Sequence, residues 1–177
     1  MKTASQILND AISSVCPVDG VSVGYPADKS TWRVDYSPSA TPEQLAAANT
    51  IIDSFDIETA IKNHVLISAV NDLRDQKFVA GYTDATTGKT YPCDPISLPR
   101  WTAIEAASGL AMVMNATPTF DVITADNSII TLSAADAFAL FHGRVMPWFS
   151  VTAIFARKMK DAIIAGKAPA DLTLGWP

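Results

Sequence analysis

Few residues in this chain suit metal binding or covalent chemistry. Its 177 residues include two cysteines and two histidines, and there is no Cys-x-x-Cys motif. Structural zinc needs four clustered thiolate or imidazole ligands, whereas Cys16, Cys93, His64 and His142 fall in separate predicted elements. We therefore predict no metal site and no cofactor. We interpret both cysteines as reduced, buried thiols, although the sequence leaves a disulfide between them open.

The sequence also lacks a surplus of positive charge and a long apolar run. Its net charge is −5 at pH 7, and 18% of its residues are charged. Nucleic-acid binding depends on clustered Lys and Arg, so we expect no nucleic-acid partner. The most apolar stretch, residues 145–156, is shorter than the roughly 18 residues of a membrane span. Polar residues interrupt positions 1–16, so we expect no secretion signal and a soluble protein.

No catalytic motif is visible. Gly-x-Ser-x-Gly, His-Glu-x-x-His and Gly-x-Gly-x-x-Gly are all absent. The tripeptide Thr87-Gly88-Lys89 lacks the full spacing of a phosphate-binding loop, and a strand is predicted to follow it. Two carboxylates that meet in space could still act as an acid and a base, which a sequence cannot reveal. We predict no catalytic residues and a protein that is not an enzyme.

Residues 1–56 are predicted to form a hairpin-and-helix segment. The first 16 residues have the pattern of a short amphipathic helix. Two β-type runs, 21–25 and 31–36, flank a Pro-Ala-Asp turn and predict a hairpin. Thr41-Pro42-Glu43-Gln44 has the residues of a capping box, with proline at the first helical position, and predicts the start of a helix. The predicted inward face of that helix comprises Leu45, Ala48, Ile52 and Phe55.

Residues 57–166 are predicted to form a second segment that starts with a helix and a hairpin. An apolar residue at every fourth position predicts a helix over 57–76. His64 lies beside that stripe without an acidic, histidine or cysteine partner three or four residues away, so we interpret it as a structural or solvent-facing histidine. Strands are predicted over 78–82 and 89–93, closed by a turn at 84–88.

A second helix and hairpin follow in the same segment. Asp94 or Ser97 is predicted to cap a helix that ends near Asn115. The second half of this helix is apolar all round, which predicts burial on more than one side. The residues concerned are Leu110, Met112, Val113 and Met114. Strands over 121–124 and 128–132 surround an Ala-Asp-Asn-Ser turn.

Ser133 is predicted to cap a long last helix that Gly166 ends. Its apolar residues recur with heptad spacing: Phe138, Phe141, Val145, Trp148, Thr152, Phe155, Met159 and Ala162. This stripe has two interpretations, a core face packed on the helix of residues 98–115 or a seam between subunits. Gly143 and Pro147 argue against a long straight coiled coil.

Residues 167–177 are predicted to form an extended C-terminal tail that docks either on its own domain or on a partner. Tryptophan is enriched among binding hot spots, so we predict partner contacts through the aromatic and apolar residues of the last helix and the tail. These candidates are Trp148, Phe149, Leu172, Leu174 and Trp176. The whole pattern predicts an α+β fold of short antiparallel hairpins with long packed helices.

Two stretches carry a family resemblance. "GYTDATTGKTYPCDPISLPRWTAIEAA" and "FDVITADNSIITLSAADAFALFHGRV", followed by a helix ending in "ARKMKDAI", resemble a small domain family of unknown function found in tailed bacteriophages and prophages. The resemblance covers about residues 78–166. Residues 30–56 are similar to leader segments of other phage tail-associated proteins. The family has no established catalytic residues to transfer.

The resemblance implies a place among tail and tail-fibre proteins. It implies a structural or adaptor component of the tail, at the baseplate or a fibre, which is assembled in the host cytoplasm and is located in the virion tail. Its partners would be other tail or fibre proteins, with a homo-oligomer as a further expectation. Two alternatives stay open: a cytoplasmic assembly chaperone for tail fibres that is absent from the virion, and a tail-associated depolymerase.

Overall fold

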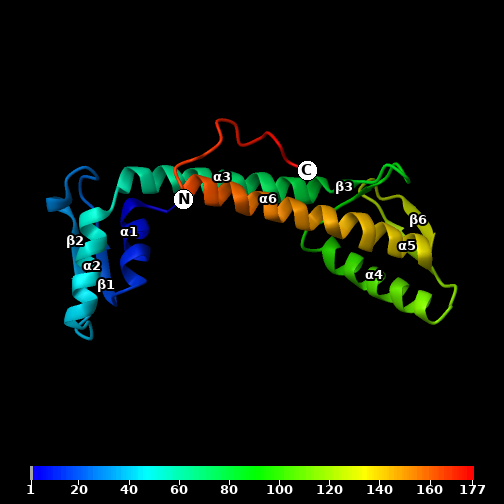
Figure 1. Cartoon of the computed structure of the whole chain (residues 1–177), viewed down its shortest axis with the longest axis horizontal. Coiled ribbons are helices and arrows are strands. Elements are labelled where there is room, and N and C mark those ends of the chain that lie inside the picture. The colour runs from blue at the N-terminus through cyan, green and yellow to red at the C-terminus, as the bar shows by residue number, and fades with distance from the viewer. Residues whose placement is uncertain (1) are drawn as a thin grey trace. The chain divides into compact units, whose positions relative to one another are not determined.

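Within residues 2–177, which the computed structural model describes, helices alternate with three two-stranded antiparallel sheets. This confirms the predicted α+β fold. The chain divides into two units, one ending at Ser68 and one beginning at Ala69. The boundary lies within α3 (Ile57–Ala80). Figure 1 shows the elements of both units.

The first unit begins with a capped helix and a hairpin. In α1 (Ala4–Ser13), Thr3 and Gln6 form a capping box, which supplies partners for two otherwise free backbone N–H groups. Strands β1 (Val18–Ser22) and β2 (Arg33–Tyr36) pair antiparallel. The hairpin was predicted correctly, but β2 starts at Arg33 rather than at residue 31, since Lys29–Thr31 form a 3₁₀-helical turn. Strand β1 lies earlier than the predicted run 21–25 because Tyr25 belongs to the turn. Its amide N–H donates to the Thr31 hydroxyl over 2.8 Å, and its carbonyl accepts from the Trp32 indole over 3.0 Å.

Helix α2 (Pro42–Ser54) completes the core of the first unit. It starts at the predicted capping box, in which Thr41 accepts from the Gln44 amide and the Gln44 side chain accepts from the Thr41 amide. Ala48 is fully buried, as predicted for the inward face. The buried members of this core are Leu8, Ile12, Cys16, Ala48 and Ile57. Phe55 then takes an extended conformation and ends α2, and α3 follows.

Helix α3 is longer than predicted. It runs to Ala80 rather than to about residue 76, so residues 78–80 are helical and the prediction of a strand from Phe78 was wrong. The helix ends where Gly81 takes a φ of +81°, a left-handed conformation that favours glycine. The hairpin itself was predicted correctly, but its strands are short: β3 (Tyr82–Thr83) and β4 (Thr90–Tyr91).

The second unit continues with α4 (Ser97–Val113), β5 (Thr119–Ile123) and β6 (Ile129–Ser133). These elements confirm the predicted helix and hairpin. In the turn between β5 and β6, Asn127 has a φ of 58°, as expected for an Asp-Asn turn.

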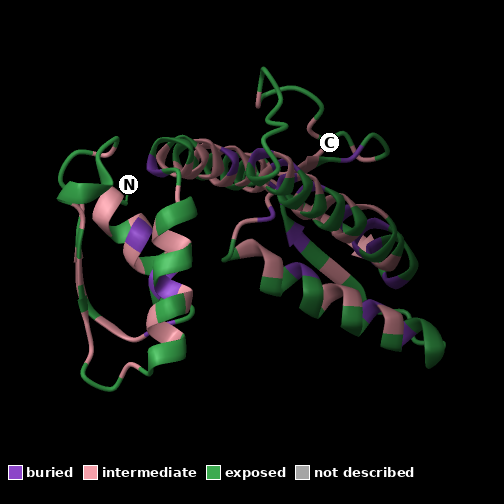
Figure 2. Cartoon of the chain, turned by 60° about the vertical axis from the view of Figure 1, so that its left-hand side comes forward, coloured by how far each residue is buried: buried purple, intermediate pink, exposed green. Residues whose placement is uncertain are grey.

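The second half of α4 is buried on one side only, contrary to the prediction of burial on more than one side. Leu110, Met112, Val113 and Met114 are between 46% and 81% exposed. The buried face of α4 consists instead of Trp101, Ser108 and Ala111. Because α4 is covered on one face only, these apolar side chains of its other faces are exposed. Figure 2 colours the chain by burial and shows buried stretches alternating with exposed ones along the helices.

The last helix is interrupted. It comprises α5 (Ala134–Leu140), the π-helical turn η2 (Phe141–Val145) and α6 (Met146–Ile164). In η2 the amide of Met146 donates to the carbonyl of Phe141, five residues back. Pro147 lacks an N–H group for the ordinary helical bond to residue 143, which explains the irregularity. As predicted, the Ser133 hydroxyl caps the start of this helix, and Gly166, with a φ of 71°, follows its end.

The π-turn changes the buried stripe of the last helix. Its C-terminal part buries Thr152, Ala156, Met159 and Ile163. This confirms Thr152 and Met159 of the predicted stripe, whereas Phe155 and Ala162 lie one residue too early and are only half-buried. Val145, Thr152 and Met159, which are seven residues apart as predicted, are all buried, so the heptad spacing holds at these positions and fails at Phe155 and Ala162. The interpretation as a core face is confirmed, since the stripe is buried within the chain.

The core of the second unit is aromatic. Phe141 stacks on Trp101 at 5.0 Å between ring centroids and meets Tyr91 edge to face at 5.9 Å. The buried members are Tyr91, Cys93, Trp101, Val122, Leu140, Phe141 and Val145. Helix α6 lies beside the part of α3 that belongs to this unit (Figure 1), and Lys160 donates to the Asn71 side chain over 3.2 Å. The last helix therefore packs on α4 through α5 and η2, and on α3 through α6.

Candidate functional site

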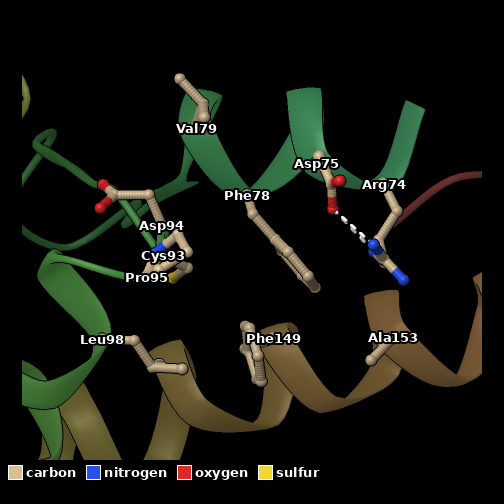
Figure 3. A pocket seen from close by; sticks show the side chains of 10 residues that line it. All are labelled: Arg74, Asp75, Phe78, Val79, Cys93, Asp94, Pro95, Leu98, Phe149 and Ala153. Atoms are coloured by element: carbon tan, nitrogen blue, oxygen red, sulfur yellow. Dashed lines mark hydrogen bonds and ion pairs between the residues drawn. The ribbon is translucent and has the colours of Figure 1, made fainter. Parts of the chain in front are cut away.

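The second unit contains an apolar groove with a volume of about 630 Å³. Three separate segments line it: the end of α3, the connection between β4 and α4 together with the start of α4, and the first turns of α6 (Figure 3). The lining residues are Arg74, Asp75, Phe78, Val79, Cys93, Asp94, Pro95, Leu98, Phe149 and Ala153. We take this groove as the candidate functional site.

Two aromatic rings form the centre of the groove. Phe78 of α3 and Phe149 of α6 stack with 4.5 Å between their centroids, a favourable arrangement for two aromatic rings. Trp148 meets Phe78 edge to face at 6.4 Å. At the rim, Val79 is 65% exposed and points away from the stacked rings (Figure 3). The groove therefore offers an apolar surface with an exposed aliphatic rim.

The charged groups that line the groove have local partners. The Arg74 guanidinium lies 2.7 Å from the Asp75 carboxylate. Asp94 accepts from the amides of Ile96 and Ser97, over 2.8 and 3.0 Å, and from the Ser97 hydroxyl over 2.8 Å. Burial alone raises the pKa of Asp94, but these hydrogen bonds from Ser97 and Ile96 outweigh it and lower the pKa below its usual value. Asp94 thus caps α4, as predicted.

Cys93 lies within the groove wall but is not poised for reaction. Its side chain is buried, and its thiol lies 3.6 Å from the Tyr91 carbonyl oxygen. Burial raises the pKa of the Cys93 thiol to about 11, whereas a reactive cysteine needs a lowered pKa and access to solvent. Cys16 and Cys93 are both free and buried, as the sequence indicated.

A buried ion pair fixes the hairpin next to the groove. Asp84 is only 1% exposed, and its carboxylate lies 3.1 Å from Nε of Arg144 in the π-turn. The other carboxylate oxygen accepts from the Thr87 amide over 2.8 Å, and Arg144 also donates to the Thr86 hydroxyl over 3.0 Å. The Thr87 hydroxyl lies 3.0 Å from the Tyr91 hydroxyl. These contacts tie the turn between β3 and β4 to the π-turn, and they account for the Thr87-Gly88-Lys89 segment as part of a turn.

The two hairpins of the second unit are also joined. The Ala125 amide donates to the Thr90 carbonyl over 2.9 Å, and the Lys89 ammonium lies 3.0 Å from the Asp126 carboxylate. Side-chain hydrogen bonds hold the pKa of Asp126 well below its usual range. The largest effect comes from the Thr124 hydroxyl, followed by the Ser128 hydroxyl and the Lys89 ammonium. Asp126 is therefore an ionised turn residue and not a candidate general acid.

The predicted partner-binding residues take different places. Phe149 lies in the groove, whereas Trp148 packs against the aromatic core behind it. In the tail, Trp176 meets Phe155 at 5.1 Å and donates to the Leu172 carbonyl over 2.8 Å. Leu174 is 68% exposed. The tail thus docks on its own unit through Trp176, and partner binding by these residues stays a prediction.

The histidines have partners that their sequence spacing did not reveal. His64 accepts from the Lys2 amide over 3.1 Å. His142 of the π-turn lies 2.7 Å from Glu105 of α4 and stacks on Phe138. Across residues 2–177, no group of three or more His, Cys, Asp or Glu side chains is placed to hold a metal ion. None of the described helices has both the length and the apolar character that a membrane crossing needs.

Most groove residues were not predicted as site residues. Arg74, Val79, Pro95 and Leu98 come from segments that carry no binding motif. The sequence feature that could have pointed to the groove is Val79, an apolar residue at the end of a helix, two positions before Gly81. Such a pattern is also typical of ordinary helix ends. Only the fold brings the three segments together.

Residues 60–174 match the family described as Domain of unknown function (DUF4376). The chain belongs to this family, and the match includes every residue of the groove. No curated protein and no solved structure matches the chain significantly.

Proposed function

We propose that the protein is a non-enzymatic adaptor of a bacteriophage tail, at the baseplate or a tail fibre, which binds another tail protein through the groove. The observation that carries the binding role is the chemistry of the groove. Its centre is apolar, its charged side chains are paired or cap a helix, and its thiol is protonated. Apolar surface of this kind drives protein association, but it offers no general base or nucleophile.

The assignment to a phage tail is supported by the sequence resemblance of residues 78–166. The tail association belongs to the proposal, because the DUF4376 family is itself of unknown function. Mass spectrometry of purified particles from a host strain that carries the gene tests it directly. The adaptor role requires the protein in the particle, and its absence there would contradict that role.

The groove is tested by a matched pair of substitutions. Val79 lies at the rim and Ile164 lies far along α6 from the groove residues, and both are 65% exposed near the C-terminal end of a helix. A lysine at either place meets the same favourable helix dipole. We expect Val79→Lys to abolish co-purification of the tail partner and Ile164→Lys to retain it. Equal binding by the two variants would show that the groove is not the binding site.

The two alternatives give different results in the same preparations. An assembly chaperone would bind fibre protein in the lysate through Val79 and be missing from particles. A depolymerase would degrade host-wall glycans in an assay with the purified protein. Neither has a specific observation in its favour in the described structure.

A further inference from the structure

Among the described residues, β6 pairs with β5 alone, so its outer edge faces no other strand. The Thr124 amide donates to the Ser128 carbonyl over 3.0 Å, so residues 124 and 128 form a hydrogen-bonded pair. Such pairs alternate along an antiparallel ladder, and the register joins Ile123 to Ile129 and Asp121 to Thr131. The N–H and C=O groups of Ile129 and Thr131 therefore point away from β5. Among the described residues, none accepts a hydrogen bond from their N–H groups.

The two edges of this hairpin differ. Next to the edge of β5, the Ala125 amide bonds to the Thr90 carbonyl of β4, so part of that side is covered. Within residues 2–177 no strand pairs with the far side of β6. One face of the hairpin packs on the core through Val122, while the opposite face is exposed, including the neighbouring side chains of Ile123 and Ile129.

The β6 edge also lacks the features that usually protect an edge strand. Natural proteins block such edges with charged side chains, proline, bulges or very short strands. Residues 129–133 read Ile-Ile-Thr-Leu-Ser, without charge or proline. The five-pair register runs without a bulge. An edge with these properties is suited to pairing with another strand.

We propose that two copies of the protein associate through antiparallel pairing of their β6 edges, which forms a four-stranded sheet across a two-fold axis. A two-fold contact brings identical surfaces together, and this edge carries no charge that would repel its copy, although the whole chain has a net charge of −5. With Thr131 on the axis, the outward carbonyl of Ile129 faces the N–H of Ser133 in the second copy, while the Ser133 carbonyl belongs to the first hydrogen bond of α5. The same arrangement extends the exposed isoleucine face across the sheet. The pairing does not depend on the groove.

The test uses two proline substitutions at cross-strand partners. Thr131→Pro removes an outward N–H from β6, and Asp121→Pro removes one from β5. Both leave the bonds between the two strands in place, because residues 121 and 131 are not a hydrogen-bonded pair, and proline is tolerated where its missing N–H faces outward. Both also lose the same side-chain contact, 2.7 Å between the Thr131 hydroxyl and the Asp121 carboxylate. The pair therefore differs in the edge that it blocks and in one charge, since only Asp121→Pro removes a carboxylate.

Sedimentation equilibrium of the full chain gives the readout, with circular dichroism as a check of folding. We expect a dimer whose dissociation constant rises at least about tenfold in Thr131→Pro, because interchain hydrogen bonds are lost, and is unchanged in Asp121→Pro. A monomer at all concentrations, or a dimer that Thr131→Pro leaves intact, would overturn the proposal. So would equal dissociation by two folded proline variants.

Cross-linking decides the question if either proline variant unfolds. In Thr131→Cys the new thiols of two copies lie opposite each other on the axis, within the span of a disulfide. In Thr119→Cys the thiol lies on β5, away from the contact. The native cysteines are buried and should give no background. Mild oxidation should yield a covalent dimer of Thr131→Cys only, and cross-linking of both variants or of neither would refute the β6 contact.

Discussion

Removal of Arg144 should leave a carboxylate buried without its countercharge. Asp84 is 1% exposed, whereas the Arg144 side chain is 32% exposed. In Arg144→Met, Asp84 keeps the hydrogen bond from the Thr87 amide but loses the guanidinium. Breaking one side of a buried ion pair costs about 3–5 kcal/mol. Because one edge of this pair reaches solvent, we expect the lower end, about 3 kcal/mol of unfolding free energy.

The reverse substitution should cost less. In Asp84→Asn, Arg144 can turn its charged end towards water, and a loss of about 1 kcal/mol is expected, typical of one hydrogen bond. The double variant Asp84→Asn with Arg144→Met removes both charges. It should be more stable than Arg144→Met alone by about 1–2 kcal/mol.

Urea unfolding followed by tryptophan fluorescence measures these values without screening the charges. Trp32 belongs to the first unit, and Trp101, Trp148 and Trp176 belong to the second. A Trp32→Phe background therefore restricts the signal to the unit that holds the ion pair. The reasoning would be refuted if Arg144→Met cost less than about 1 kcal/mol, or if Asp84→Asn were the more damaging change.

Three further predictions concern a helix cap, a thiol and a glycine. Thr41→Ala should cost about 1 kcal/mol in urea unfolding because it removes the cap of α2, whereas Thr41→Ser should cost little; equal losses would contradict the capping role. In a Cys16→Ala background, iodoacetamide should modify Cys93 in urea but scarcely in the native state at pH 8. The raised pKa of about 11 keeps the native Cys93 thiol protonated until the pH approaches that value. Rapid labelling of the native protein would instead show an accessible thiolate. Gly81→Ala should lower the melting temperature by several degrees, since a Cβ there would lie 2.4 Å from the Tyr91 carbonyl oxygen at a φ of +81°; an unchanged melting temperature would exclude this clash.

Local signals in the sequence predicted where most elements begin. Thr41, Asp94 and Ser133 act on the backbone of their own neighbourhood, so their roles follow from sequence alone. The same is true of Gly166, which follows the last helix, and of the Asp126-Asn127 turn. These signals need no knowledge of the rest of the fold.

The sequence-based predictions were wrong where a contact with a distant part of the chain determines the local structure. Phe78 suits a strand by propensity, but in the structure its ring stacks on Phe149, about 70 residues away along the chain, from a helical position. Apolar residues on several sides of α4 predicted burial, yet the structure covers one face only. Amino-acid type cannot distinguish a side chain inside the core from one exposed on the surface.

The candidate site could not be predicted for the same reason. Its residues come from 74–79, 93–98 and 149–153, and none of these segments has a motif. Phe149 was predicted as a partner contact because it is an apolar residue on the flank of the last helix, and the structure places it in the groove. The other residues become recognisable only when α3 and α6 lie side by side.

The π-turn makes the last helix sensitive to length in one place. Each residue of an α-helix advances the chain by about 100° around the axis, so deletion of one residue within 141–145 would preserve a helix but rotate everything that follows. Thr152, Ala156 and Ile163 would then turn away from the core that now buries them. Insertions after Gly166 would leave the buried faces of α5 and α6 in their present orientation. Across the family, the chain should therefore vary in length after the last helix and hold its residue count constant between Ser133 and Ile164.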